Sequence, residues 1–183
     1  MNELEKFLRA DYEKWKDLPY LHEMVNGRYE GITMGEFIEK VNYLGTYFVN
    51  NGYKGKNIGI YSPNSIAWMI ADVAIMNYVG LSVGLAKDWM GDNLDYAIGK
   101  CEISCMLYSK AVEDRLKDVM AKYEDVEFIC IEDDFDRMLE EGKAACKELF
   151  ALEPVDEDKP AKIVFTSGST SFPKAVMLSV KNI

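Results

Sequence analysis

Hydroxyl-bearing residues gather around one glycine near the end of the 183-residue sequence, and a lysine closes the group. The run reads Thr166, Ser167, Gly168, Ser169, Thr170, Ser171, Phe172, Pro173 and Lys174. Short apolar segments of β character, residues 162–165 and 176–178, flank it. Backbone amides, hydroxyls and an ammonium group are the donors that surround phosphate oxygens in proteins. The sequence therefore predicts a strand–loop–strand unit that binds a polyphosphate.

A Walker A loop, G-x-x-x-x-G-K-S/T, is the obvious alternative, because Gly168 and Lys174 have its spacing. Pro173 stands in place of its second glycine, where proline offers no amide and cannot adopt a positive φ. Ala175 replaces the hydroxyl that would bind magnesium. A β-type run also follows where the Walker helix would begin. These residues exclude a Walker loop.

Residues 165–176 resemble the signature of the adenylate-forming superfamily, which includes acyl-CoA ligases, luciferases and peptide-synthetase adenylation domains. The signature, Y/F-T-S-G-S/T-T-G-x-P-K-G-V, matches at ten of twelve places, counting the free position. Upstream, residues 31–36 look like I-T-Y-x-E, residues 58–71 like V-A-I-x-x-x-N-S-x-E-W-x-x-A, and residues 81–85 like V-x-V-P-L. Within this superfamily, the sequence most resembles bacterial long-chain fatty-acid-CoA ligases.

This resemblance implies a two-step reaction. A carboxylic acid, expected to be a fatty acid, attacks the α-phosphate of magnesium ATP to give acyl-AMP and pyrophosphate, and the thiol of CoA then displaces AMP. ATP, Mg²⁺ and CoA are therefore the implied ligands of the parent enzyme. The phosphate contacts are expected from the loop's hydroxyls, its glycine and its lysine: Thr166, Ser167, Gly168, Ser169, Thr170 and Lys174.

The family's later elements are not among these 183 residues. They comprise the Y-G-x-T-E segment that binds adenine and magnesium, the ribose-binding aspartate, the hinge and the acyl-activating lysine. We therefore expect residues 1–183 to be the amino-terminal portion of the AMP-binding domain, truncated, without a catalytic residue and without turnover. The strand at residues 176–179 would then lie at an open sheet edge, which predicts self-association or a poorly ordered tail.

Apolar periodicity predicts an α/β fold with a mainly parallel sheet that helices cover on both faces. Strands are expected at residues 57–61, 81–85, 103–108, 126–131 and 162–165. Helices are expected at residues 34–50, 66–79, 92–100, 112–120 and 135–149. Thr33 and Glu36 have the form of a capping box for the first of these helices.

The composition predicts one soluble globular unit, since 49% of the residues are hydrophobic and 28% are charged. A net charge of -10 excludes a protein that binds nucleic acid or an anionic membrane through its overall field. The four cysteines lack the spacing of a disulfide scaffold, which favours a reduced, cytoplasmic protein. Residues 66–85 are long enough to span a membrane, but Asp72 and Asn77 favour a buried helix followed by a strand.

Several other residues could suggest a site, and packing explains each of them better. His22 is the only histidine and receives no role. Cys101 and Cys105 lack a second ligand pair for zinc. The acidic run at residues 132–136 precedes a helix, where it favours the positive end of the helix dipole. Six aromatic residues are expected in cores and boundaries: Trp15, Trp68, Trp89, Tyr12, Tyr20 and Tyr29.

Three hypotheses about function stay open. The first is a piece of an acyl-CoA ligase. The second is a non-catalytic nucleotide-binding or acyl-adenylate-binding module, favoured by departures from the family pattern at Ser171, Ala175 and Val180, with Gly84 a further departure. The third is an interaction domain of the same fold without a ligand.

Overall fold

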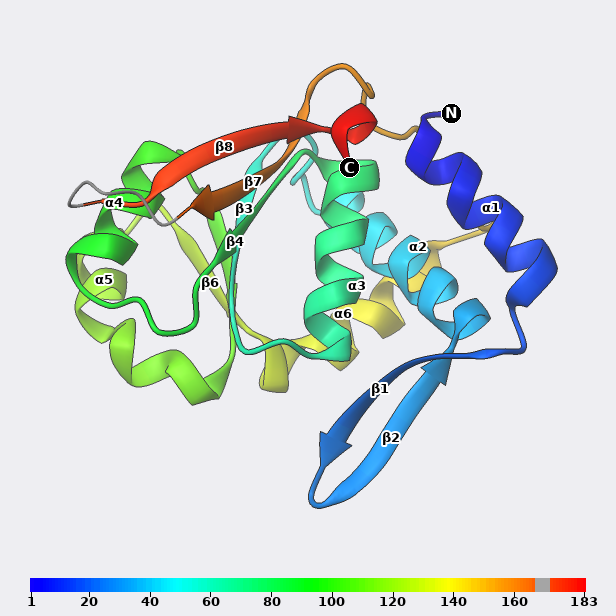
Figure 1. The fold of residues 1–183 in the computed structure, drawn as a ribbon, viewed down its shortest axis with the longest axis horizontal. Helices are drawn as coiled ribbons and strands as arrows, with labels where there is room; N and C mark the ends of the chain where they lie inside the picture. The colour runs from blue at the N-terminus through cyan, green and yellow to red at the C-terminus, as the bar shows by residue number, and fades with distance from the viewer. Residues whose placement is uncertain (167–171) are drawn as a thin grey trace.

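A six-stranded, mainly parallel sheet organises the chain in the computed structural model, which describes residues 1–166 and 172–183 (Figure 1). The order across the sheet is β6-β5-β3-β4-β7-β8. The strands are β3 (Asn57–Tyr61), β4 (Leu81–Leu85), β5 (Cys105–Tyr108), β6 (Glu127–Cys130), β7 (Pro160–Thr166) and β8 (Lys174–Ser179). All neighbouring pairs are parallel except the antiparallel pair of β7 and β8. The predicted α/β class is confirmed.

Helices cover both faces of the sheet and enclose two apolar cores. On one face lie α2 (Met34–Asn50), α3 (Ile66–Ala74) and α6 (Ile131–Ala145), with α1 (Glu3–Trp15) packed against α2. On the other lie α4 (Asp92–Lys100), the 3₁₀ helix η2 (Lys110–Arg115) and α5 (Lys117–Lys122). Ile60 of β3 joins the first core and Tyr61 the second, because successive side chains of a strand point to opposite faces. Burial on both faces explains why these strands read as continuous apolar runs.

Helix α2 begins at the predicted capping box and packs tightly on α6. The Thr33 hydroxyl accepts a hydrogen bond from the Glu36 amide at 3.2 Å, and the Glu36 carboxylate accepts one from the Thr33 amide at 2.8 Å. The helices approach so closely that a Cβ on Gly142 would lie 1.9 Å from the Tyr43 carbonyl oxygen. Glycine is therefore required at this crossing.

The apolar run at residues 66–85 lies inside the molecule as α3, a π-helical turn η1 (Ile75–Val79) and β4. The sequence predicts one helix up to residue 79, but the last turn widens so that the Gly80 amide donates to the Ile75 carbonyl at 3.0 Å. Among the described residues, no helix is long and apolar enough to cross a membrane. Asp72, in the middle of α3, is buried beside the sheet.

Two other helices differ from the prediction in their bounds. The helix expected at residues 112–120 is split into η2 and α5, because the Ser109 hydroxyl accepts from the Ala111 amide and starts a tighter turn. Helix α6 begins directly after β6, where three acidic residues favour its amino end. It ends at Ala145, because the backbone becomes extended at Cys146. The expected continuation to residue 149 is therefore wrong.

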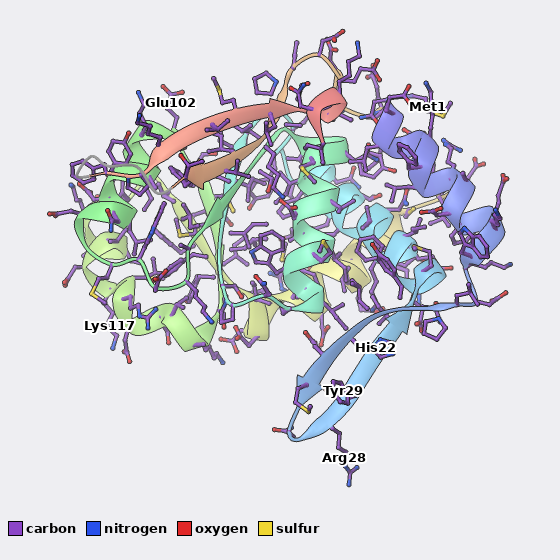
Figure 2. All side chains as sticks on the ribbon, in the orientation of Figure 1. Met1, His22, Arg28, Tyr29, Glu102 and Lys117 are labelled. Atoms are coloured by element: carbon purple, nitrogen blue, oxygen red, sulfur yellow. The ribbon has the colours of Figure 1, made fainter. Side chains whose placement is uncertain are left out.

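Sequence reasoning missed α1 and the two-stranded hairpin of β1 (Pro19–Val25) and β2 (Arg28–Thr33). Figure 2 shows the hairpin extending from the body of the molecule, with Arg28 and Tyr29 near its free end. Asn26 and Gly27 form its turn with φ values of 50° and 78°. The dipeptide Asn-Gly is a strong hairpin signal that could have identified it. His22 pairs with Gly31 inside this hairpin and is exposed.

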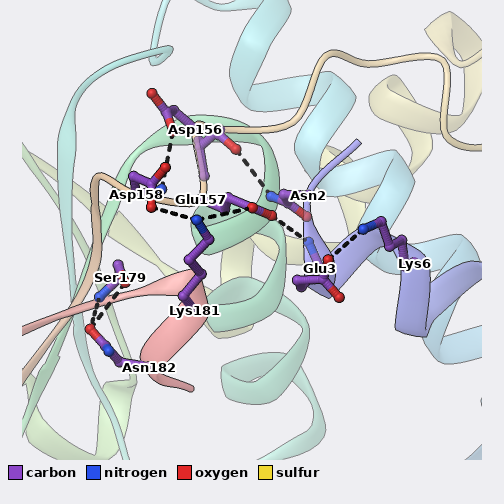
Figure 3. Close-up of polar contacts among 10 residues, drawn as sticks. Asn2, Glu3, Lys6, Asp156, Glu157, Asp158, Ser179, Lys181 and Asn182 are labelled. Carbon is purple, nitrogen blue, oxygen red and sulfur yellow. Dashed lines mark hydrogen bonds and ion pairs between the residues drawn. The ribbon is translucent and has the colours of Figure 1, made fainter.

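The connector at residues 153–160 joins the two ends of the described chain (Figure 3). The Asn2 side-chain amide donates to the Val155 carbonyl at 3.1 Å, and the Glu3 amide donates to the Glu157 carboxylate at 3.1 Å. Lys181 forms an ion pair with Asp158 at 2.6 Å. These contacts fix the chain just before it enters β7.

Candidate functional site

The β7–β8 hairpin brings together the two described ends of the phosphate loop. Thr166 and Lys174 are Cα partners in the antiparallel register, so their side chains leave the hairpin on the same face. Both residues are exposed. A hydroxyl and an ammonium group on one face are a donor set that fits phosphate oxygens. The other four predicted contacts lie outside the described residues: Ser167, Gly168, Ser169 and Thr170.

The loop opens at the carboxyl edge of the parallel strands. Strand β7 lies beside β4, which lies beside β3, and all three run in the same direction. The chain places β4 on one side of β3 and β5 on the other, so the strand order reverses between β3 and β5. Open α/β sheets bind ligands outside the carboxyl ends of their strands at such a switch point. Thr166 and Lys174 therefore lie at the carboxyl edge of the sheet, with β4 and β3 between β7 and the switch point.

Ala175 replaces a glycine of the family signature without backbone strain. It lies within β8, opposite Phe165, and its side chain packs on the core that contains α4. The non-glycine residues with positive φ in the described chain do not include it. Ala175 therefore no longer favours the non-catalytic alternative, whereas Ser171 lies outside the described residues.

Aromatic side chains surround the base of the loop on the α4 face. The ring centroids of Trp89 and Phe165 lie 4.8 Å apart in an edge-on arrangement, and those of Tyr96 and Phe172 lie 4.8 Å apart with nearly parallel planes. The Tyr61 hydroxyl donates to the Trp89 carbonyl, and burial raises the pKa of Tyr61. Sequence reasoning expected Trp89 to pack, which is confirmed, and expected the same of Tyr29, which is instead 77% exposed. It did not identify Tyr96 or Phe172, because Phe172 occupies the free position of the signature.

A buried ion pair holds β7 on the opposite face. The Lys162 ammonium lies 2.5 Å from one Asp72 oxygen, and the Ser82 hydroxyl donates to the other at 2.6 Å. The same ammonium lies 5.4 Å from the centroid of the Trp68 ring. Asp72 of α3, Ser82 of β4 and Lys162 of β7 thus join three neighbouring elements behind the loop.

The acidic run at the start of α6 serves the fold, as predicted. Glu132 accepts from the Ser109 hydroxyl at 2.5 Å and from the Lys110 amide at 3.0 Å, and these bonds lower its pKa against the opposing effect of burial. Asp133 pairs with Lys110. The described residues contain no group of three His, Cys, Asp or Glu side chains that could hold a metal ion.

Solved acyl-CoA ligases share this fold. A long-chain-fatty-acid-CoA ligase from Archaeoglobus fulgidus matches with a TM-score of 0.80 and 20% identity, over 98% of this chain and 36% of that one. The anthranilate CoA ligase AuaEII, solved in complex with anthranoyl-AMP, matches with a TM-score of 0.81 and 14% identity. That match covers 98% of this chain and 34% of AuaEII.

Curated relatives are similar in sequence over most of this chain. Long-chain-fatty-acid–CoA ligase 5 of Rattus norvegicus is 26% identical over 181 residues, and fatty acyl-CoA synthetase A of Dictyostelium discoideum is 29% identical over 178 residues. Each alignment covers 86% of this chain but 26% of the relative, so the chain spans about a quarter of those proteins. The model of the family described as AMP-binding enzyme matches residues 8–183, and the chain therefore belongs to that family.

Proposed function

We propose that this chain supplies the triphosphate-binding hairpin of an ATP-dependent acid–thiol ligase, which activates a fatty acid as acyl-AMP and transfers it to CoA. The observation that carries the proposal is the pairing of Thr166 with Lys174 at the carboxyl edge of the sheet. Membership of the AMP-binding family and the similarity to fatty acyl-CoA ligases support it. The activity is proposed for the whole protein.

In this proposal the hairpin binds and orients the triphosphate of ATP. The Lys174 ammonium neutralises phosphate charge, and the Thr166 hydroxyl donates a hydrogen bond from the same face. Ser167, Gly168, Ser169 and Thr170 are proposed to add further donors. The fatty-acid carboxylate attacks the α-phosphorus as the bond to pyrophosphate breaks, and the thiol of CoA later attacks the acyl carbon as AMP leaves. Charge held in a fixed place near the phosphates favours departure of pyrophosphate.

Isothermal calorimetry with ATP tests the role of Lys174. The unmodified chain should bind ATP saturably, and Lys174→Ala should weaken binding by about 10- to 100-fold, because a hydrogen bond to a charged group contributes about 1.5–3 kcal/mol. Thr166→Val keeps the side-chain shape and should have a smaller effect. Lys6→Ala, on α1 at the other end of the molecule, is the matched control and should bind like the unmodified chain (Figure 1).

Tripolyphosphate provides a second probe, because it carries the phosphates without the nucleoside. Lys174→Ala should weaken the affinity for tripolyphosphate as it weakens the affinity for ATP. No saturable ATP binding, or equal ATP affinity of the Lys174→Ala and unmodified chains, would sink the proposal.

We further propose that residues 1–183, as the amino-terminal portion of the AMP-binding domain, do not catalyse turnover alone. The segments to which the resemblance assigns adenine, magnesium and acyl activation are not among these residues. ATP–pyrophosphate exchange by this chain should stay at the level of the buffer. Exchange above that level would contradict the assignment of those roles to other segments.

The outer position of β8 leads us to propose self-association of the 183-residue chain. Strand β8 pairs with β7 on one side, ends the described sheet and exposes Met177 by 63%. Unpaired edge strands with exposed apolar residues recruit further strands. Sedimentation velocity should show a concentration-dependent dimer that Met177→Lys weakens. A strict monomer at all concentrations would contradict this.

A further inference from the structure

The segment that carries Lys174 is attached to α4 on both sides of the lysine. Before it, the Phe172 ring stacks on Tyr96 with centroids 4.8 Å apart and planes inclined by 16°. After it, Ala175 packs on the core beneath α4. Lys174 itself leaves β8 on the opposite face, since neighbouring residues of a strand alternate. Two contacts on one face therefore set the direction of the side chain on the other.

The link between Phe172 and Lys174 is short and stiff. Only Pro173 separates them, and its ring fixes one backbone angle near -65°. A displacement of the Phe172 ring is therefore transmitted to the start of β8. Phe172 is 40% exposed, so burial alone does not fix the position of its ring. Stacking on Tyr96 contributes to holding the ring in place.

Tyr96 belongs to a well-anchored helix. Leu94, Ala97 and Ile98 of α4 are fully or almost fully buried in the core that also receives Phe165. Asp95 accepts a hydrogen bond from the Tyr123 hydroxyl at 2.8 Å and forms an ion pair with Lys122 at 2.5 Å. The helix therefore offers Tyr96 as a fixed platform, against which Phe172 is placed.

We propose that Tyr96 is a positioning residue for the phosphate site, which acts through Phe172 and Pro173 to direct the Lys174 ammonium. This inference rests on the proposed binding of ATP phosphates by Lys174. Tyr96 itself does not contact the nucleotide in this scheme. It sets the geometry of a donor that does.

The first test measures ATP affinity by calorimetry in variants of Tyr96. Tyr96→Ala should weaken ATP binding by about two- to tenfold, the range that one aromatic pair supports. Tyr96→Phe keeps the ring and should bind like the unmodified chain. Tyr29→Ala removes a tyrosine that is 77% exposed on the β1–β2 hairpin, far from α4, and serves as the matched control (Figure 2). Circular dichroism establishes that each variant is folded.

A double variant distinguishes positioning from direct contact. If Tyr96 acts through the lysine, adding Tyr96→Ala to Lys174→Ala should cause no further loss of ATP affinity. Tyr96→Ala should also weaken the affinity for tripolyphosphate by the same factor as the affinity for ATP. An additive loss in the double variant, or an unchanged tripolyphosphate affinity in Tyr96→Ala, would mean that the tyrosine ring does not act through the lysine, and would overturn the inference.

The stack can also be tested without any nucleotide. With 4-fluorophenylalanine at position 172 alone, the ¹⁹F resonance should shift strongly in Tyr96→Leu and only slightly in Tyr96→Phe, because the ring of residue 96 lies over the probe. An unchanged resonance in Tyr96→Leu overturns the inference. If the unmodified chain fails to bind ATP, the proposed function fails with it; if ATP binding depends on Lys174 but not on Tyr96, only the positioning role fails.

Discussion

Breaking the Lys162–Asp72 pair should destabilise the fold far more than removing a surface ion pair. The side chains of Lys162 and Asp72 are 18% and 3% exposed, and their charged atoms lie 2.5 Å apart. Lys162→Met replaces the ammonium with an apolar group of similar length. Within residues 1–166 and 172–183, the Ser82 hydroxyl, which donates to the other oxygen, is then the one side-chain partner left to Asp72.

The expected loss in free energy of unfolding is about 3–5 kcal/mol, the range for removing one partner of a buried pair. The partial exposure of Lys162 favours the lower end, near about 3 kcal/mol. Since a domain is stable by about 5–15 kcal/mol, this loss would remain measurable without complete unfolding in most of that range. Asp72→Leu combined with Lys162→Met should recover most of it, because two apolar side chains leave no unpaired charge.

Urea unfolding followed by circular dichroism measures these differences. Lys117→Ala is the matched control, because Lys117 pairs with Asp114 at 2.6 Å but the two side chains are 69% and 90% exposed. Its removal should leave the urea midpoint close to that of the unmodified chain, because solvent screens an exposed pair. Two results would show that the buried pair does not stabilise the packing of β7. One is a loss in free energy of unfolding in Lys162→Met no larger than that in Lys117→Ala. The other is a double variant that is less stable than either single variant.

Three further predictions concern other buried positions. Gly142→Ala should lower the free energy of unfolding by about 3 kcal/mol, since its Cβ would lie 1.9 Å from the Tyr43 carbonyl oxygen; an unchanged urea midpoint would contradict this. A thiol reagent at pH 8 should label the half-buried Cys146 first and spare Cys105, because burial raises the pKa of Cys105 to about 12. A fast phase of labelling that survives Cys146→Ser would contradict this. Burial also raises the pKa of Tyr108 to about 12. The unfolded chain therefore releases the protons of Cys105 and Tyr108 near their ordinary pKa values of 9.0 and 10.0, whereas the folded chain retains both protons to higher pH. The free energy of unfolding should therefore fall as pH rises from about 9 through about 12, and a flat dependence in urea titrations would contradict it.

The sequence predicts best those elements whose local signals agree with their burial. Strand β3 is apolar on both faces and is found at its predicted bounds, and Thr33 with Glu36 fixes the start of α2. Helix α1 was missed because its residues are largely charged and its few buried side chains, such as Leu8, give a weak apolar pattern. The π turn at the end of α3 depends on where Gly80 meets β4, which no local pattern encodes.

The site shows the same contrast between residues that a local motif predicts and residues that only tertiary packing brings together. Thr166 and Lys174 were named from a local motif, and the antiparallel pairing of their strands was expected from the flanking β segments. Tyr96 lies 76 positions before Phe172 (172 minus 96) and has no motif of its own, so only the tertiary structure brings them together. Likewise, Asp72 was expected to be buried, but its partner Lys162 is known only from the packing of α3 on β7.

Distance along the β7–β8 hairpin separates the residues that stabilise the fold from the proposed binding site. Lys162 is four residues before Thr166, about 13 Å along the strand, so its pair with Asp72 holds the sheet without approaching the loop. Tyr96 lies beside the loop, is only half-buried, and contacts an exposed ring, so its loss removes little from the core. Lys162→Met should therefore lower the free energy of unfolding while the folded fraction binds ATP normally. Tyr96→Ala should weaken ATP binding while it leaves the free energy of unfolding nearly unchanged. Proportional changes of stability and ATP affinity in both variants would show that the hairpin responds as one unit, and that its two ends do not act independently.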